Sequence, residues 1–423
     1  MGWNSFDCYG SAITEAEFRA NVDVMAEVLK PHGWEYAVVD FCWSHPDPGP
    51  CHNPHQGVGF CPMLHCDEQG RLVPAPNRFP SAADGAGFKP LADYVHGKGL
   101  KFGIHIMRGI PHQVAFEDML VCDRKVRASD IALLDSTCTW LNHMRGVDVS
   151  KPEGQAYYDS LFALYAEWGV DFVKVDDILA DGHPDSEGPY HAAEIEAIGR
   201  AIEKCGRPMV LSLSPGDAPK AKAEHVANHA SMWRMSSDFW DDWKKLKRMF
   251  ELTHWWTSHR RPGRWPDADM LPLGRLSKRG PKGPERNSWF TAEEQKTLMT
   301  LWTIFGSPLM FGGALVDLDD ATTKLITNRA VNDIIKFGRD GAQLLREDDF
   351  IVWTASDSRD DVVKYVALFN LGDESTDATF DLTEHGLPIN QATDLWSGAN
   401  VAVIDGAFRG ELSPHGCIYL ELK

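Results

Sequence analysis

Residues 171–178, DFVKVDDI, read as a buried strand that ends in charge. A phenylalanine and two valines supply the aromatic and β-branched side chains that strands favour. Two adjacent carboxylates, Asp176 and Asp177, follow them, and Lys174 stands two positions before the first. Parallel strands covered on both faces are usually apolar throughout. The charged residues therefore indicate that the carboxyl end of this strand has a functional role.

Strand-like and helix-like segments alternate on both sides of this strand. Helical spacing extends over residues 14–30, and a short apolar run of strand type follows at 35–43. A second helical pattern, residues 154–169, leads directly into the opening strand. Roughly eight such units fit into the first part of the chain. We therefore predict an α/β fold, a (β/α)8 TIM barrel formed by residues 1–337.

The pattern changes near residue 338. Short strands with turn signals and no long helices follow, at residues 349–356, 362–371, 378–383 and 417–423. We predict a C-terminal antiparallel β domain over residues 338–423.

Composition narrows the functional class. The formal net charge of −19 argues against nucleic acid and anionic membranes as partners. We find no run of about eighteen apolar residues and no basic-then-apolar pattern at the start of the sequence. Nine cysteines are an odd number for a disulfide framework, and no Asn-x-Ser/Thr acceptor is present. We therefore expect a cytoplasmic protein, with secretion after removal of a signal peptide as the alternative.

Carboxylates gather where the predicted barrel strands end, and this is the face on which TIM barrels carry their active sites. They are Asp40, Asp176, Asp177, Asp238, Asp267 and Asp269. Because strand side chains alternate between faces, Lys174 and Asp176 share a face. A nearby ammonium favours the ionised carboxylate, which a nucleophile requires. A structural ion pair explains Lys174 and Asp176 equally well.

A second acid stands in MWRMSSDFWDDW, residues 232–243, where Asp238 follows a short strand that ends at Arg234. We expect Phe239 and Trp240 to desolvate Asp238, and desolvation favours the protonated form that a proton donor needs. The alternative is that Asp238 caps a helix beginning near Phe239.

Tryptophans near the strand ends complete a pocket of the kind that binds sugars, because indole faces stack on the C–H faces of pyranose rings while carboxylates and cations bind hydroxyls. They are Trp3, Trp43, Trp233 and Trp265. A long excursion, residues 44–80, holds a group of possible zinc ligands whose spacing matches no common pattern, so we favour a pocket-lining loop. These are Cys51, His52, His55, Cys61, His65 and Cys66. His105 fits a core position or a site position equally well.

These motifs resemble glycoside hydrolase family 27, the α-galactosidase and α-N-acetylgalactosaminidase family, and they match it in order along the barrel. The segments are MGWNSF (1–6), GVDFVKVDD (169–177), MWRMSSDFWDDW (232–243), RWPDADML (264–271) and SPLMFGG (307–313). The resemblance implies a C-terminal β-sandwich, no metal or other cofactor, and a retaining mechanism. It places the nucleophile at Asp176 and the acid/base at Asp238, with their carboxyl groups about 5–5.5 Å apart.

The resemblance also implies sugar-binding roles, in which Arg234 holds the 2-hydroxyl or its substituent and Lys174 with Asp40 holds the hydroxyls opposite. The positions that we assign to substrate binding are Trp3, Asp40, Trp43, Lys174, Ser214, Arg234, Asp269 and Met270. Two departures concern specificity. Phe41 replaces the second of two adjacent aspartates, which removes a ligand for O4 or O6, and Ser214 stands near a bulky glutamate position, which leaves room for a 2-acetamido group.

Several hypotheses remain open. The leading one is a retaining exo-glycosidase for a terminal α-D-galactosyl or α-N-acetylgalactosaminyl residue, with a glycoside or oligosaccharide as substrate. The same family also contains β-L-arabinopyranosidases and an isomaltodextranase. A different class is a Mg²⁺-dependent barrel enzyme with Asp176, Asp177 and Asp267 as ligands. A third is a catalytically silent sugar-binding barrel. The sequence leaves a homo-oligomer open.

Overall fold

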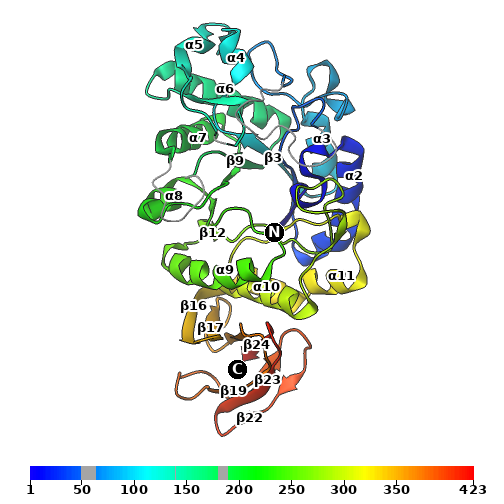
Figure 1. The fold of residues 1–423 in the computed structure, drawn as a ribbon, viewed down its shortest axis with the longest axis vertical. Helices are drawn as coiled ribbons and strands as arrows, with labels where there is room; N and C mark the ends of the chain where they lie inside the picture. Colours follow the sequence, from blue (N-terminus) through cyan, green and yellow to red (C-terminus); the bar gives the residue numbers. More distant parts are fainter. Residues whose placement is uncertain (49–62, 139, 180–188) are drawn as a thin grey trace.

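The computed structural model describes residues 1–48, 63–138, 140–179 and 189–423. Its larger part is a sheet of eight parallel strands in the order β12-β11-β10-β9-β3-β2-β1-β15 (Figure 1). The strands are β1 (Gly2–Asn4), β2 (Tyr36–Val39), β3 (Lys101–Met107), β9 (Phe172–Asp176), β10 (Val210–Leu213), β11 (Met232–Arg234), β12 (Trp265–Asp267) and β15 (Met310–Phe311).

The two edges of this sheet meet. Leu271, in the segment that follows β12, forms an isolated parallel bridge with Phe311 of β15. The amide of Leu271 donates to the carbonyl of Met310, at 2.7 Å, and its carbonyl accepts from the amide of Gly312, at 3.0 Å. The sheet therefore curls into a barrel, and all its carboxyl ends open on one face.

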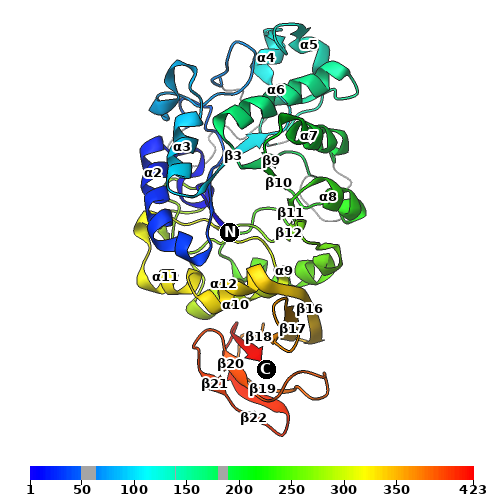
Figure 2. The same ribbon diagram turned by 180° about the vertical axis from the view of Figure 1, so that it is seen from behind.

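Helices surround the barrel, as the two opposite views in Figures 1 and 2 show. They are α2 (Glu15–Val24), α3 (Lys89–Gly97), α6 (Pro152–Trp168), α7 (Ala192–Cys205), α8 (Ala223–His229), α9 (Trp243–Trp256), α10 (Ala292–Phe305), α11 (Asp320–Ile326) and α12 (Arg329–Phe337), and a short α1 (Phe6–Tyr9) follows β1. Local signals set their ends. Thr14 and Glu17 form a capping box on α2, and α6 stops at Gly169, whose φ of 83° suits glycine.

Between β3 and α6 the chain makes an excursion built from very short elements, which our reading of the sequence did not identify. They are β4 (Ile110–Pro111), α4 (His112–Phe116), β5 (Leu120–Val121), β6 (Val126–Arg127), α5 (Ala128–Ile131), β7 (Ala132–Leu133) and β8 (Met144–Val147). A small hairpin of β13 (Arg275–Leu276) and β14 (Arg286–Asn287) follows β12.

The C-terminal part is a sandwich of antiparallel sheets. One sheet has the order β16-β17-β18-β24-β20-β21 and the other the order β19-β23-β22. The strands are β16 (Gly338–Glu347), β17 (Phe350–Asp357), β18 (Lys364–Asn370), β19 (Thr376–Asp381), β20 (Ala392–Asp394), β21 (Asn400–Val401), β22 (Val403–Ile404), β23 (Ala407–Leu412) and β24 (Cys417–Leu422). A separate apolar cluster that includes Val366, Phe380, Phe408 and Leu420 fills the space between the sheets.

The larger sheet of the sandwich lies against α9 and α10 of the barrel, as Figure 2 shows. The ring of Phe250 on α9 meets Phe369 edge-on at 4.9 Å, and Phe305 on α10 meets Trp353 at 6.2 Å. The predicted fold class, a TIM barrel with a C-terminal β-sandwich, is confirmed. Within the described residues, every helix is too short or too polar to cross a lipid bilayer.

Candidate active site

A pocket with a volume of about 320 Å³ opens at the carboxyl ends of the barrel strands. Both acids that the sequence singled out, Asp176 and Asp238, line this one pocket. Most of its other lining residues are polar or aromatic. They are Phe6, Asp7, Asp40, Phe41, Trp140, Lys174, Pro215, Gly216, Arg234, Ser237, Phe239, Trp240, Lys245, Asp269, Met270 and Lys282.

Asp176, the last residue of β9, is buried and held on one side. Its Oδ2 lies 2.8 Å from Nε2 of His105, which the neighbouring strand β3 supplies. Its Oδ1 is buried, and the hydroxyl of Ser214 also helps to lower the pKa of the carboxyl. Burial raises the pKa of this carboxyl, but the opposing effects of His105 and Lys174 prevail and bring it to about 2. Asp176 is therefore ionised at neutral pH, and it lines the pocket.

Lys174 and Asp40 form a buried pair beside Asp176. Lys174 Nζ donates to Asp40 Oδ2 at 3.1 Å, and Asn4 Nδ2 donates to the same oxygen at 2.7 Å. Burial opposes the charge on Lys174, but Asp40 and Asp176 outweigh it and raise the pKa of the ammonium. A cation flanked by two carboxylates at a pocket wall is suited to hold sugar hydroxyls.

Asp238 occupies the loop after β11, and its side chain is 56% exposed. Arg234 NH2 lies 3.5 Å from Asp238 Oδ1 and 2.6 Å from Asp269 Oδ2. Lys245 Nζ donates to the backbone carbonyl of Asp238 at 2.6 Å and ties the loop to α9. The expected desolvation of Asp238 is wrong, because its side chain stays 56% exposed although Phe239 and Trp240 line the same pocket.

The alternative role of Asp238 as a helix cap is also wrong. Helix α9 begins at Trp243, and its N-cap is Asp242, whose carboxylate accepts from the amide of Lys244 at 2.8 Å. Asp238 makes no such bond to the backbone of this helix. Its carboxylate is therefore available to a substrate in the pocket.

Asp7 is a pocket residue that sequence reasoning missed. Its side chain is 1% exposed and its Oδ2 has no hydrogen-bond partner among the described residues. Burial, followed by repulsion from Asp269 and Asp238, raises the pKa of this carboxyl well above its ordinary value. A neutral carboxylic acid at the pocket wall can donate a hydrogen bond. The signal was present, since Asp7 follows the end of a barrel strand, but β1 has only three residues.

Aromatic rings, rather than charged groups, form another wall of the pocket. Phe41 is 3% exposed and meets the edge of His105 at 5.4 Å, with Trp140 at 6.1 Å and Phe6 at 6.5 Å between ring centroids. Trp140 comes from the excursion after β3, so the sequence did not mark it. This wall has no polar group at the position where the resemblance leads us to expect an aspartate.

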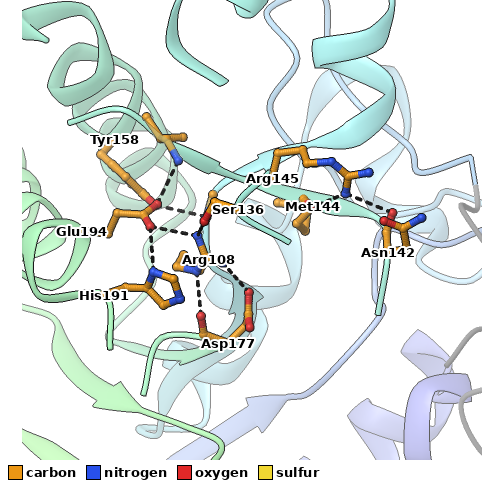
Figure 3. Close-up of polar contacts among 11 residues, drawn as sticks. Arg108, Ser136, Asn142, Met144, Arg145, Tyr158, Asp177, His191 and Glu194 are labelled. Carbon is orange, nitrogen blue, oxygen red and sulfur yellow. Dashed lines mark hydrogen bonds and ion pairs between the residues drawn. The ribbon is translucent and has the colours of Figure 1, made fainter. Parts of the chain in front are cut away.

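Arg108 anchors the backbone at Asp176 and Asp177, and Figure 3 shows its contacts with Asp177 and Glu194. Its amide donates to the carbonyl of Asp176 at 3.0 Å, and its guanidinium binds the Asp177 carbonyl at 2.7 Å and Asp177 Oδ2 at 2.8 Å. Asp177 has a φ of 58°, which is uncommon for a residue with a Cβ. The arginine therefore holds the turn that follows the nucleophile candidate in a conformation the chain disfavours.

Buried acids surround this arginine. Glu194 Oε2 accepts from Arg108 at 2.9 Å, and Glu194 Oε1 accepts from the hydroxyl of Tyr158 at 2.7 Å (Figure 3). Burial lowers the pKa of His191, which lies 3.7 Å from Glu194, to about 3, so this imidazole is neutral. Burial also raises the pKa of Asp177 to about 6, although Arg108 opposes this effect.

The structure brings most of the predicted substrate-binding residues together. Asp40, Lys174, Arg234, Asp269 and Met270 line the pocket with the two acids. Ser214 is buried at the end of β10, and the next two residues, rather than its own side chain, reach the pocket.

The predictions for Trp3 and Trp43 are corrected. Both indoles are buried in the core, and neither lines the pocket. Trp3 packs at 5.6 Å on Phe18 of α2 and donates to the carbonyl of Gly313, while Trp43 meets the ring of Phe88 at 5.2 Å. Each fills space between the barrel and its helices.

The sequence raised two possible metal sites, a zinc site in the long excursion and a Mg²⁺ site at the strand ends. Four of the possible zinc ligands, Cys51, His52, His55 and Cys61, lie outside the residues that the structure describes. The carboxylates of Asp176, Asp177 and Asp267 do not form a compact ligand group in the part of the chain that the structure describes. Asp177 is committed to Arg108, and Asp267 Oδ1 accepts from the amide of Asp269 at 2.9 Å. The arrangement does not support the Mg²⁺-dependent alternative.

Comparison with known proteins agrees with this geometry. The family profile described as alpha galactosidase A matches residues 58–120 and 147–336, and the alpha galactosidase C-terminal beta sandwich domain matches residues 347–422. Alpha-galactosidase 2 of Arabidopsis thaliana is 28% identical over 99% of this chain and 87% of its own length.

Two solved structures are nearer still. A family 27 β-L-arabinopyranosidase from Geobacillus stearothermophilus is 47% identical, with a TM-score of 0.94 over 100% of this chain and 95% of its own. A Bacillus halodurans protein whose proposed activity is α-N-acetylgalactosaminidase is 45% identical, with a TM-score of 0.87 over 100% of this chain and 96% of its own.

A TIM barrel that gathers acids, cations and aromatic rings in one strand-end pocket, together with these relatives, defines a glycoside hydrolase. Within that class, the chain belongs to glycoside hydrolase family 27, the alpha galactosidase A family.

Proposed function

We propose that this enzyme is a retaining exo-glycosidase in which Asp176 is the nucleophile and Asp238 the acid/base. The observation that carries the proposal is that both carboxylates line one pocket of about 320 Å³, with Asp176 buried and ionised and Asp238 exposed. The volume is suited to one pyranose ring. A single-ring pocket at a barrel mouth removes terminal sugars rather than cleaving within a chain.

In the first step a carboxylate oxygen of Asp176 attacks the anomeric carbon while the glycosidic C–O bond breaks. The proton of Asp238 passes to the departing oxygen, so the aglycone leaves as a neutral alcohol. His105 stays on Oδ2 of Asp176 and keeps the carboxylate oriented toward the sugar. The product is a glycosyl ester on Asp176 and an ionised Asp238.

In the second step Asp238 removes a proton from water, and the water oxygen attacks the anomeric carbon from the face that the aglycone left. The ester bond to Asp176 breaks and its carboxylate is restored. Two inversions give net retention. The exposure of Asp238 favours this step, because water reaches a side chain that is 56% exposed without a conformational change.

The substrate class that we propose is a terminal α-D-galactoside, with the N-acetylgalactosaminide as its 2-substituted form. Support comes from the curated relatives described as alpha-galactosidases and from the pair of Lys174 and Asp40 at the pocket wall, which is suited to bind sugar hydroxyls. Asp176 and Arg234, which line the same pocket, would bind near C1 and C2.

One observation favours a second candidate, a β-L-arabinopyranoside. This sugar has the ring configuration of an α-D-galactoside but carries no hydroxymethyl group at C5. Phe41 lines the pocket and its ring supplies no hydrogen-bond partner for a sixth-carbon hydroxyl, and a polar group left unpaired in an apolar site weakens binding. The structure that is 47% identical is described as a β-L-arabinopyranosidase.

Aryl glycosides distinguish the two. We would compare kcat/KM for p-nitrophenyl α-D-galactoside, α-N-acetylgalactosaminide and β-L-arabinopyranoside in the wild type and in Phe41→Asp. The variant should raise the galactoside-to-arabinoside ratio by about 10-fold or more, because the new carboxylate accepts from the hydroxymethyl group. Phe6→Leu is the matched control, since it alters the same wall without adding a hydrogen-bond acceptor. An unchanged ratio would show that Phe41 does not contact this part of the sugar.

We also propose a cytoplasmic location. All seven cysteines in the described part of the chain are free, as a reducing compartment requires.

A further inference from the structure

A group of metal-ligating side chains lies outside the active-site pocket, on the neighbouring helices α7 and α8. Figures 1 and 2 show these helices side by side on the outside of the barrel. Glu196 of α7 and His225 and His229 of α8 each offer one ligand atom, and these atoms all lie within 4.8 Å of one another. Among the described residues, no other set of three acidic, histidine or cysteine side chains is this compact.

The spacing on α8 suits a shared ligand. His225 and His229 are four residues apart, so they stand on the same face of the helix one turn apart. Their ring centroids are 4.5 Å apart, with the planes 33° from parallel. His225 Nε2 lies 3.2 Å from Glu196 Oε1. When two ligand atoms each lie about 2.0–2.2 Å from a tetrahedral zinc ion, the distance between those two atoms is close to the 3.2 Å that separates His225 Nε2 from Glu196 Oε1.

Neighbouring groups orient two of the three ligands. The hydroxyl of Tyr190 lies 2.6 Å from His225 Nδ1. When this oxygen accepts the Nδ1 proton, Nε2 presents its lone pair toward Glu196, as a metal-bound imidazole does. Arg200 NH1 lies 3.6 Å from the other carboxylate oxygen of Glu196, Oε2, and leaves Oε1 on the histidine side.

We propose that Glu196, His225 and His229 bind one divalent transition-metal ion, of which zinc is the best match to two imidazoles and a carboxylate. Water completes the tetrahedron. The ion joins α7 to α8 and braces the outer wall of the barrel. It takes no part in hydrolysis, because none of its ligands lines the pocket that contains Asp176 and Asp238.

Calorimetric titration of the metal-stripped full-length protein with zinc chloride tests the site. We expect one high-affinity equivalent, and a rise in Tm of about 3 °C when free zinc is about 100 times Kd. The double substitution His225→Gln and His229→Gln should abolish this binding. His96→Gln is the control, because His96 pairs with only one carboxylate, Asp171, and should bind zinc as the wild type does.

Two further measurements separate zinc binding at this site from loss of the folded state and from zinc binding by cysteines. Tyr190→Phe should weaken zinc binding about 10-fold without loss of the folded state, because it removes only the group that orients His225. Cobalt substitution should give a spectrum without thiolate charge transfer, which separates this site from any cysteine ligands. The absence of uptake, uptake that survives the double substitution, or a thiolate band would each overturn the proposal. Hydrolysis of aryl glycosides should be the same with and without zinc.

Discussion

The two acids of the pocket belong to strands next but one to each other, and the chain holds them in very different ways. Asp176 ends β9 with its side chain 10% exposed, His105 against one oxygen, and Arg108 bound to the following backbone. Asp238 stands in the loop after β11 with its side chain 56% exposed and a 3.5 Å contact to Arg234.

The difference matches the two tasks. A nucleophile must be ionised and aimed before the substrate arrives, and a fixed position lowers the entropic cost of reaching the near-attack geometry. An acid/base must exchange a proton with solvent once in each cycle. We infer that the folded protein prepares Asp176, whereas the bound sugar and aglycone complete the environment of Asp238 by excluding water from it.

The largest expected effect comes from removing the carboxylate of Asp176, the acid that the folded protein holds in position. Asp176→Asn should lower kcat by about 10⁴-fold or more on every glycoside, because no covalent intermediate forms without the carboxylate. Stopped assays with p-nitrophenyl glycosides measure this loss. In Asp176→Gly, added azide should attack the anomeric carbon directly and give a glycosyl azide of inverted configuration. Turnover of Asp176→Asn at the wild-type rate would remove Asp176 from the mechanism.

The effect of removing Asp238, the exposed acid, should depend on the leaving group of the substrate. Asp238→Ala should lower kcat/KM by about 10²–10⁴-fold for alkyl glycosides, which need protonation, and by much less for activated aryl glycosides. Azide should rescue it with retained configuration, because the Asp176 ester still forms. The two azide products, read by proton NMR, therefore assign the two roles independently. An equal loss on both classes of leaving group contradicts the assignment to Asp238.

Strand-end chemistry was the part of the site that the sequence could predict, because parallel strands converge on one face. Asp40, Lys174, Asp176 and Asp238 were found in this way. The tryptophans were misplaced because proximity to a strand end does not specify a face. Adjacent strand residues point oppositely, so while Asn4 reaches Asp40, its neighbour Trp3 turns outward to α2.

Other features depended on contacts that sequence periodicity does not carry. Trp140 lies in an excursion whose strands have two to four residues, too few to show a pattern. The clamp between Arg108 and Glu194 joins residues far apart in the chain. The burial of Asp7, and with it the shift in its pKa, is set by the whole pocket rather than by its sequence neighbours. The domain boundary at residue 338 stays a prediction.

A smaller effect should sharpen the comparison without removing either acid. Arg108→Lys keeps a cation but loses the fork that binds both the carbonyl and the carboxylate of Asp177. We expect kcat to fall about 10- to 100-fold with little change in KM, since the sugar-binding side chains remain. Arg207→Lys is the matched control at the other end of β9, where Arg207 pairs with Asp171. Similar losses of kcat in both variants would make the effect one of general stability.

The smallest expected effect concerns stability and pH. Burial, with repulsion from Asp269, raises the pKa of Asp7 well above 3.8, its ordinary value in an unfolded chain, so we expect Asp7 to stay protonated in the folded protein. Above that value the unfolded state loses a proton that the folded state keeps, so stability falls as pH rises, by at most ~1.4 kcal/mol per pH unit, until the folded pKa is passed.

Asp7→Asn removes this loss while keeping a hydrogen-bond donor at the pocket wall. Urea unfolding should show the variant more stable than the wild type at pH 7, with the difference shrinking toward pH 4. Asp317→Asn is a control, since this more exposed carboxylate pairs with Lys278 and should not reproduce the gain. A variant that is less stable than the wild type at pH 7 would mean that Asp7 is ionised in the folded state. The pocket would then hold one more negative charge beside Asp238, and an acid that must donate a proton to the leaving group would be surrounded by a stronger field favouring its protonation.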